Sequence, residues 1–152
     1  MADQTPGPPP ASVAFLLIAV GRHARDRVEA ALKREGIALR HMSALGHLSG
    51  DEAISYSELA RRASVTPQSM QATLRRLEEL GAVLKTTDSG RGRTAQLFVT
   101  AEGQRLLDVG RAAIAEVDDI IADHLDPDVA EQMVPAFLTV LRALAGDGGN
   151  SA

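Results

Sequence analysis

Apolar residues recur at helical spacing in several segments of the chain, and cap or turn residues separate these segments. Ser12 can cap a first helix, which we expect to cover about residues 12–36 and to end at Gly36. A second helix is predicted over about residues 39–48, with Gly50 beyond its end. The chain is therefore expected to begin with a long helix followed by a shorter one.

Two further helices are predicted close together in the middle of the chain. Ser55 followed three residues later by Glu58 is a capping-box pattern, which opens a short helix over residues 56–63. Thr66 then caps a helix over residues 67–80 whose first residue is proline, where the missing N–H costs nothing. The three residues between these helices leave room only for a tight turn, which predicts a helix-turn-helix. The expected buried stripe of the second helix is Met70, Leu74 and Leu77.

Gly81 is expected to end this helix, and the apolar residues after it no longer recur at helical spacing. Residues 82–86 and 96–99 are predicted to form two short strands. The segment between them is rich in glycine and carries Arg91 and Arg93, as the tip of a hairpin would. A helix-turn-helix followed by such a hairpin is the order of a winged helix.

Two long helices are predicted after the hairpin. Thr100 can cap a helix to about His124, and Asp126 with the proline after it opens a last helix to about Ala145. The apolar positions of the last helix keep the helical period: Val134, Phe137, Leu138, Leu141 and Leu144. We therefore expect a mainly α fold with a small β-hairpin, in which a winged helix-turn-helix core is flanked by long helices.

The flanking helices predict a homodimer. A winged-helix core does not need three long apolar helices, and a monomer would expose their apolar stripes to water. Burial against a second copy removes this exposure, so we interpret them as dimerisation helices.

Composition narrows the class of protein. The 152 residues suit one domain, and 45% hydrophobic with 24% charged residues is typical of soluble globular proteins. Because the chain has no cysteine, disulfides, thiolate metal sites and a catalytic cysteine are excluded. Its aromatic residues are Phe15, Tyr56, Phe98 and Phe137, too few for a platform that stacks single-stranded bases.

The net charge of −4 is distributed unevenly along the chain. Residues 54–100 contain seven basic and four acidic residues, whereas residues 101–152 contain three basic and ten acidic residues. This asymmetry is expected if the central segment meets an anion, although a solvated charged surface would show the same modest imbalance.

Several other classes of protein are not favoured. The uninterrupted apolar stretch over residues 13–20 is shorter than the roughly 20 residues that span a bilayer, and residues 1–10 lack the basic start of a secretory signal. We therefore expect a cytoplasmic protein without membrane contact. The four histidines show no metal-ligand spacing, and neighbouring Asp118 and Asp119 diverge on a helix, so we expect no metal, cofactor or catalytic group, and hence no enzyme.

The predicted core has the geometry to bind double-stranded DNA. An α-helix fits the major groove, and a thin ribbon with an arginine at its tip can enter the minor groove beside it. Off its buried stripe, the helix over residues 67–80 carries glutamine, serine and arginine side chains, which bind base edges and phosphates. An ordinary polar helix face is the alternative interpretation. Because a two-fold dimer places two such helices about one DNA turn apart, the predicted partner is a palindromic operator.

Several blocks of the chain carry a family resemblance, in this order: Ser57-Glu58-Leu59-Ala60, Pro67-Gln68-Ser69-Met70, Leu77-Glu78-Glu79-Leu80-Gly81, Lys85 and Val99-Thr100-Ala101-Glu102-Gly103. They resemble the winged-helix core of the multiple antibiotic resistance regulator (MarR) family. The resemblance implies a homodimeric transcription regulator, often a repressor released by a small aromatic or anionic molecule. It matches Arg93 to the family's minor-groove arginine. Arg91 stands where the family commonly has Asp, and Ala72 where it often has a basic residue.

The candidate sites follow from the pattern and the resemblance together. The predicted DNA-binding residues are Thr66, Pro67, Gln68, Ser69, Gln71, Ala72, Arg75, Arg76, Lys85, Arg91 and Arg93. A cleft near Arg22, His41 and Met42 is the candidate effector site. The expected parts are a disordered tail (1–11), one winged-helix domain (12–145) with a DNA-binding core (about 53–100) and dimerisation helices (about 12–36 and 101–145), and a flexible tail (146–152). The alternative function is that of a winged-helix adaptor that binds proteins without reading DNA.

Overall fold

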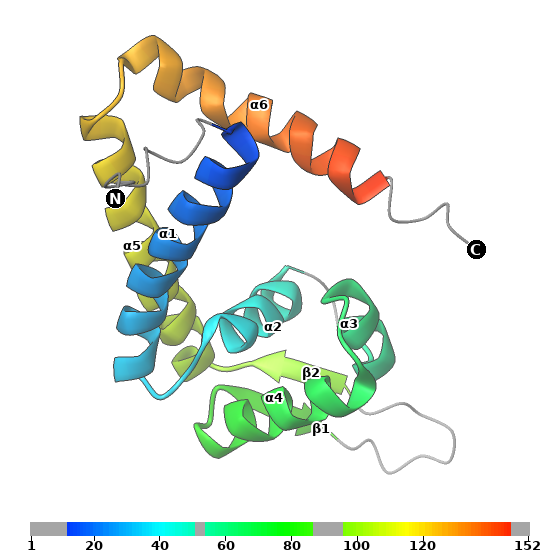
Figure 1. The fold of residues 1–152 in the computed structure, drawn as a ribbon. Coiled ribbons are helices and arrows are strands. Elements are labelled where there is room, and N and C mark those ends of the chain that lie inside the picture. The colour runs from blue at the N-terminus through cyan, green and yellow to red at the C-terminus, as the bar shows by residue number, and fades with distance from the viewer. Residues whose placement is uncertain (1–11, 51–53, 87–95, 147–152) are drawn as a thin grey trace, which may run out of the picture. The chain divides into compact units, whose positions relative to one another are not determined.

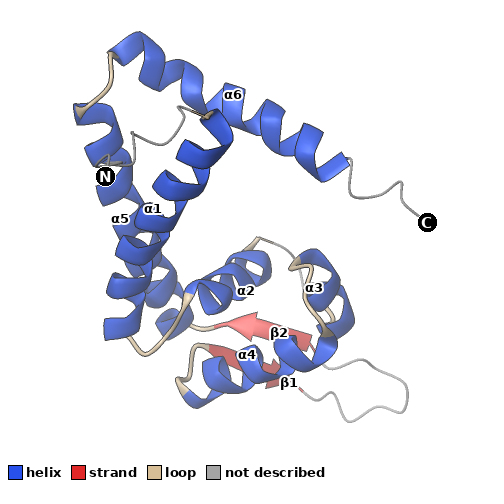
Figure 2. Ribbon diagram, in the orientation of Figure 1, coloured by secondary structure: helices blue, strands red, loops and turns tan. Residues whose placement is uncertain are grey.

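The computed structural model describes residues 12–50, 54–86 and 96–146 of the chain. The elements in chain order are α1 (Val13–Arg34), α2 (Leu39–Ser49), α3 (Tyr56–Arg62), α4 (Pro67–Glu79), β1 (Val83–Thr86), β2 (Gln96–Val99), α5 (Ala101–Asp123) and α6 (Pro127–Gly146). Figure 2 shows the two short strands among the helices. The predicted mainly α fold with a β-hairpin is confirmed, and the ends of the predicted elements agree to within about two residues. The chain divides into two compact units, residues 1–113 and residues 114–152.

The first unit has one apolar core to which five helices contribute. Each of α1 to α5 places one fully buried leucine there, in the order Leu32, Leu45, Leu59, Leu77 and Leu106. α4 contacts α2 and α3, while β1 packs on α4 and β2 on α2 (Figure 1). The second helix of the predicted helix-turn-helix, α4, is the candidate recognition helix, and it is held by packing on several sides.

Three helices of this unit end in the same backbone motif. Gly36, Ser64 and Gly81 follow the ends of α1, α3 and α4 with positive φ angles of 73°, 52° and 68°. In each case the next residue donates its N–H back across the last turn to a carbonyl five residues earlier, as in a Schellman motif. The turn between α3 and α4 is thus the predicted tight turn, with a serine where glycine is usual.

The N-terminal end of α3 forms only half of the predicted capping box. The Ser55 side chain accepts the N–H of Glu58 at 3.3 Å, as expected. The Glu58 carboxylate does not complete the box, because it accepts hydrogen bonds from Arg61 and Arg62. Two arginines in the next turn attract the carboxylate more strongly than a neutral backbone N–H does.

The hairpin strands are antiparallel, with Val83 opposite Val99 and Lys85 opposite Leu97. Because side chains alternate between the two faces of a strand, these four residues share one face. Val83 and Leu97 are buried on that face. The register therefore directs Lys85 to the same side as the core and α4.

The start of α5 is joined closely to the base of the hairpin. The Thr100 hydroxyl accepts the N–H of Gly103 at 3.1 Å and donates to the carbonyl of Gly81 at 2.6 Å. A β-carbon on Gly103 would lie 2.2 Å from the carbonyl oxygen of Ala82, so only glycine permits this approach.

The second unit contains the end of α5 and the whole of α6. The Asp126 side chain accepts the N–H of Asp128 at 3.0 Å, which confirms the predicted cap of α6. No residue of α6 is buried. Its exposed apolar side chains include Val134, Phe137, Leu138, Leu141 and Leu144. Within the described part of the chain, α6 is the one helix long and apolar enough to cross a membrane, on length and composition alone.

Candidate nucleic-acid interface

The exposed face of α4 carries side chains that the sequence singled out, most of them polar. Four residues of α4, namely Met70, Thr73, Leu74 and Leu77, are buried on its opposite face. The exposed residues at the start and middle of the helix are Pro67, Gln68, Ser69, Gln71, Ala72 and Arg75. The sequence predicted three of the four buried positions. The buried hydroxyl of the fourth, Thr73, donates to the Ser69 carbonyl at 3.0 Å, so its burial leaves no polar atom unsatisfied.

Two residues outside the exposed face hold the N-terminal end of α4. The Thr66 hydroxyl accepts the N–H of Ser69 at 3.2 Å and lies 3.0 Å from the Ser69 hydroxyl. The Tyr56 hydroxyl donates to the carbonyl of Pro67, which joins α3 to the first residue of α4. Tyr56 was not assigned to the site from the sequence alone. The one feature that could have drawn attention to it is that it is the single tyrosine of the chain.

The two neighbouring arginines of α4 have different surroundings. Arg75 is exposed. Arg76 is half-buried, and its Nε donates to the carbonyl of Gly36 at 3.2 Å, while Nη1 lies 3.4 Å from a Glu79 carboxylate oxygen. The structure therefore places Arg76 against the corner between α1 and α2, apart from the other predicted DNA-binding residues of this helix.

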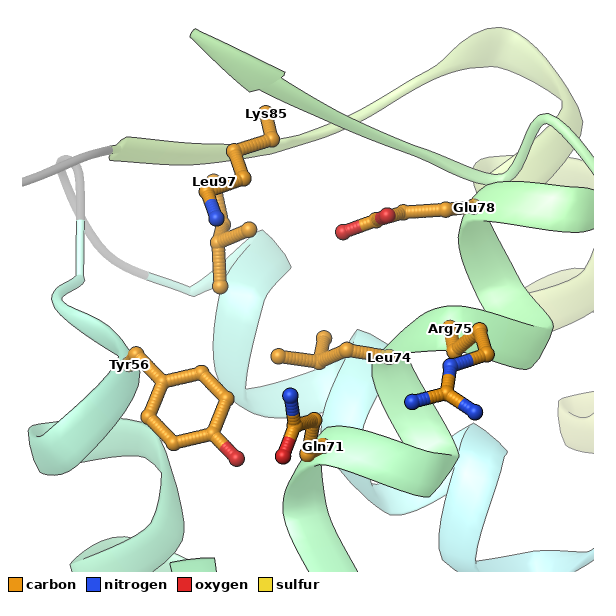
Figure 3. Close-up of a pocket in the computed structure, with 7 residues that line it drawn as sticks. All are labelled: Tyr56, Gln71, Leu74, Arg75, Glu78, Lys85 and Leu97. Atoms are coloured by element: carbon orange, nitrogen blue, oxygen red, sulfur yellow. The ribbon is translucent and has the colours of Figure 1, made fainter. Parts of the chain in front are cut away.

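A cavity of about 240 Å³ lies between α4 and the hairpin. It is lined by Tyr56, Gln71, Leu74, Arg75, Glu78, Lys85 and Leu97 (Figure 3). In Figure 3, Lys85 and Leu97 extend from the hairpin strands, while Gln71, Leu74 and Arg75 extend from the helix. The cavity thus brings together Gln71, Arg75 and Lys85, which the sequence predicted as DNA-binding residues on two separate elements.

The cations of the core are not equally available to an anion. Glu58 pairs with both Arg61 and Arg62, at 2.6 Å and 2.8 Å. Hydrogen bonds from these two guanidinium groups lower the pKa of Glu58 to about 2. Among residues 12–50, 54–86 and 96–146, Arg75 and Lys85 form no ion pair. They remain available for an external anion such as a phosphate.

Two of the predicted DNA-binding residues lie outside the described residues. Arg91 and Arg93 belong to the segment over residues 87–95, between β1 and β2. Their assignment to DNA stays a prediction from the sequence.

The three candidate effector residues differ in accessibility. Arg22 is exposed on α1. The side chain of His41 is buried, its Nδ1 accepts the N–H of Ala38 at 2.9 Å, and burial, followed by the charge of Arg40, lowers its pKa. Met42 packs against α5, where a β-carbon on Gly110 would lie 2.4 Å from the Met42 sulfur.

None of these three residues lines the cavity beside α4 or a second cavity of about 420 Å³. That second cavity is lined by Asp26, Glu29, Ala30, Lys33, Ile37 and Ala38, at the corner between α1 and α2. In the described segments, no group of three His, Asp or Glu residues is placed to hold a metal ion.

Comparisons with known proteins give consistent results. A sequence model of the MarR family matches residues 35–94 of the chain. The HTH-type transcriptional repressor Rv2887 of Mycobacterium tuberculosis is 39% identical over 118 residues, which cover 78% of this chain and 81% of that protein. A crystal structure of the M. tuberculosis MarR family protein Rv2887 in complex with DNA has a TM-score of 0.70 and 32% identity, covering 86% of this chain and 98% of the other. The complex of the same protein with salicylic acid has a TM-score of 0.65 and 33% identity, covering 86% and 96%.

Proposed function

The chain belongs to the MarR family, and on that basis we propose that it is a homodimeric, DNA-binding repressor of transcription that a small effector releases from its operator. The relative that it matches over most of its length is a transcriptional repressor, so in this proposal the chain is a regulator and not an enzyme. A regulator of this kind acts on the chromosome, so its place of action is the cytoplasm.

The observation that carries the proposal is the exposed face of α4 next to two cations, Arg75 and Lys85, that form no ion pair with the described residues. Gln68, Ser69 and Gln71 offer donors and acceptors for base edges in the major groove. Arg75 and Lys85 line the cavity between α4 and the hairpin, next to these residues, and can bind phosphates there. The similarity of the chain to a protein solved in complex with DNA supports the same assignment.

The exposed apolar faces of the end helices support the homodimer. Phe15 and Ile18 of α1 have 51% and 72% of their surface exposed, and Leu141 and Leu144 of α6 have 62% and 70%. Such contiguous apolar helix faces are unfavourable in water and stable against a second copy. In such a dimer α1, α5 and α6 are the dimerisation helices, and each copy of α4 binds one half of a palindromic operator.

The effector is a small aromatic or anionic molecule in this proposal, since a relative was crystallised with salicylic acid. The site proposed from the sequence lies near Arg22, His41, Met42 and α5. Methionine is unbranched and changes rotamer easily, so movement of the Met42 thioether off Gly110 would open apolar space between α2 and α5. Arg22 would supply the charge that attracts a carboxylate.

The decisive experiment is selection of bound fragments from the source genome by the purified chain. We expect enrichment of a palindromic sequence whose affinity falls as the salt concentration rises, and weaker binding when aromatic acids such as salicylic acid are added. If no sequence is enriched and the chain shows no salt-dependent retention on DNA, the proposal is contradicted and the adaptor is favoured. If no aromatic acid changes the DNA affinity or the melting temperature, effector control by this chemical class is wrong.

A further inference from the structure

The carbonyl of Gly36 is a rigid acceptor at the corner between α1 and α2. The N–H of Gly36 donates to the carbonyl of Lys33 at 3.1 Å, and the N–H of Ile37 donates to that of Leu32 at 3.2 Å. The side chains of Ile37 and Leu32 are both buried, which fixes the corner to the core. A group that binds the Gly36 carbonyl is therefore bound to a fixed point at the end of α1.

Arg76 of α4 binds this point from 40 residues away in the chain. Its Nε donates to the Gly36 carbonyl at 3.2 Å, and a β-carbon on Gly36 would lie 2.7 Å from Nη2. The guanidinium group thus lies directly against the backbone of Gly36, whose φ of 73° favours glycine. Its Nη1 is also directed to Glu79 on its own helix, at 3.4 Å. These contacts turn the arginine toward the corner and away from the exposed face of α4.

The same corner is connected to α5. Arg105 places Nη2 2.8 Å from a carboxylate oxygen of Glu35, the residue before Gly36. A second ion pair, to Glu102 at 2.7 Å, holds the Arg105 side chain in place. Two adjacent residues of one turn are therefore bound by arginines from two different helices, one from the recognition helix and one from α5.

We propose that Arg76 is a positioning residue that fixes the recognition helix to the α1–α2 corner, and that Glu35 and Arg105 fix α5 to the same corner. This inference rests on the proposed function, because it concerns how α4 is presented to DNA. α1 and α5 are dimerisation helices in that function. The corner is then the joint through which the dimer determines the orientation of α4.

The proposal separates Arg76 from Arg75 by their salt dependence. A side chain that neutralises a phosphate contributes about 0.9 to the slope of log affinity against log salt concentration, whereas a positioning residue contributes affinity without slope. Arg76→Ala is expected to weaken binding to the duplex that the wild-type chain selects from a random-sequence pool by about tenfold, with an unchanged slope. Arg75→Ala should reduce the slope by about one per copy. Arg76→Lys keeps the charge but replaces the planar guanidinium, whose Nε and Nη1 meet the Gly36 carbonyl and the Glu79 carboxylate at once, by a single ammonium group, so it should not restore the affinity.

Arg105→Ala tests the connection to α5, and Arg111→Ala is its matched control. Arg111 is an exposed arginine of α5 that pairs only with Asp108 on its own helix among the described residues. Arg105→Ala should weaken binding without changing the slope, Arg111→Ala should have no effect, and the losses from Arg76→Ala and Arg105→Ala should combine to less than their sum. Circular dichroism melting of each variant checks that it is folded.

Two results would overturn the positioning role. One is a loss of slope in Arg76→Ala equal to that in Arg75→Ala, with affinity restored by Arg76→Lys. The other is an affinity of Arg76→Ala or Arg105→Ala no lower than that of Arg111→Ala. If the wild-type chain selects no duplex at all, the proposed function itself is wrong, and this outcome is distinct from both.

Discussion

The Nδ1 atom of His41 accepts the backbone N–H of Ala38 at 2.9 Å and thereby closes the first turn of α2. The next N–H, that of Leu39, is accepted by the Glu29 carboxylate of α1 at 3.3 Å. Side chains therefore satisfy two N–H groups at the start of α2, where a helix has no partners of its own for them. The bond from Ala38 requires a neutral imidazole, because a protonated Nδ1 can only donate.

We expect the free energy of unfolding to fall as the pH drops below about 6.5, the ordinary pKa of histidine. Burial and the charges of Arg40 and Arg76 lower the pKa of His41 in the folded chain. The unfolded chain therefore binds a proton first, and stability is lost until the pH passes the folded pKa, below which the loss is constant. Urea unfolding between pH 5.5 and 8 measures this, a range in which Glu58, with its pKa of about 2, stays ionised.

His41→Gln should remove this part of the pH dependence, because glutamine does not titrate. His23→Gln, at an exposed position of α1, is the control and should retain it. If His41→Gln unfolds with the same pH dependence as the wild-type chain, the buried imidazole is not its source.

Ser64 has a backbone conformation that favours glycine. Its φ of 52° is in the left-handed region, which costs a residue with a side chain about 1–2 kcal/mol. We expect Ser64→Gly to raise the free energy of unfolding by about 0.5–1 kcal/mol, since the greater freedom of glycine in the unfolded chain offsets part of the gain. Ser57→Gly, inside α3, should lower stability instead. Denaturant midpoints measure both, and a destabilised Ser64→Gly would contradict the prediction.

The sequence was most informative where a local signal determines the structure. Thr66 and the proline after it defined the start of α4, and the helical spacing of Met70, Leu74 and Leu77 defined its buried face. Gly81 ended the helix for the same local reason, its positive φ. Caps, turns and periodicity depend on neighbours within a few residues, so one sequence is enough to locate them.

The sequence was least informative where a contact joins distant residues. Arg75 and Arg76 are adjacent and chemically identical, but Arg76 donates to the carbonyl of Gly36, 40 residues away in the chain, whereas Arg75 lines the cavity beside the hairpin. The role of Tyr56 depends in the same way on the carbonyl of Pro67. The search of the sequence for a membrane span counted only uninterrupted apolar residues and therefore did not single out α6. This helix is long and apolar enough to cross a membrane by length and composition, but polar residues interrupt its apolar stretches.

The dimer should depend on the apolar face of α6. Leu141 is 62% exposed in the single chain, so Leu141→Glu leaves the core intact but places a charge in the proposed interface. We expect this variant to sediment as a monomer at micromolar concentrations at which the wild-type chain is a dimer that dissociates on dilution. Gln132→Glu adds the same charge at an exposed polar position of the helix and should leave the dimer unchanged. A wild-type chain that is monomeric at these concentrations would exclude the homodimer.

The two proposed DNA-contacting parts should differ in what they recognise. Gln71 faces the cavity beside α4 and can read a base edge in the major groove, where base pairs differ in their donors and acceptors. Gln71→Ala is therefore expected to cost about 1–3 kcal/mol on the selected duplex and little on a scrambled one. Titrations of both duplexes at one salt concentration measure the difference. An equal loss on the two duplexes would show that Gln71 does not read sequence.

Arg93 should act differently, because an arginine on a glycine-rich hairpin is attracted by the narrow minor groove more than by base identity. Arg93→Ala is expected to weaken binding to all sequences and to reduce the salt slope by about one phosphate equivalent per hairpin. Repeating the titrations at several salt concentrations measures that slope. Unchanged affinity for both duplexes would mean that Arg93 and its hairpin do not contribute to DNA binding, and the adaptor function would then be favoured.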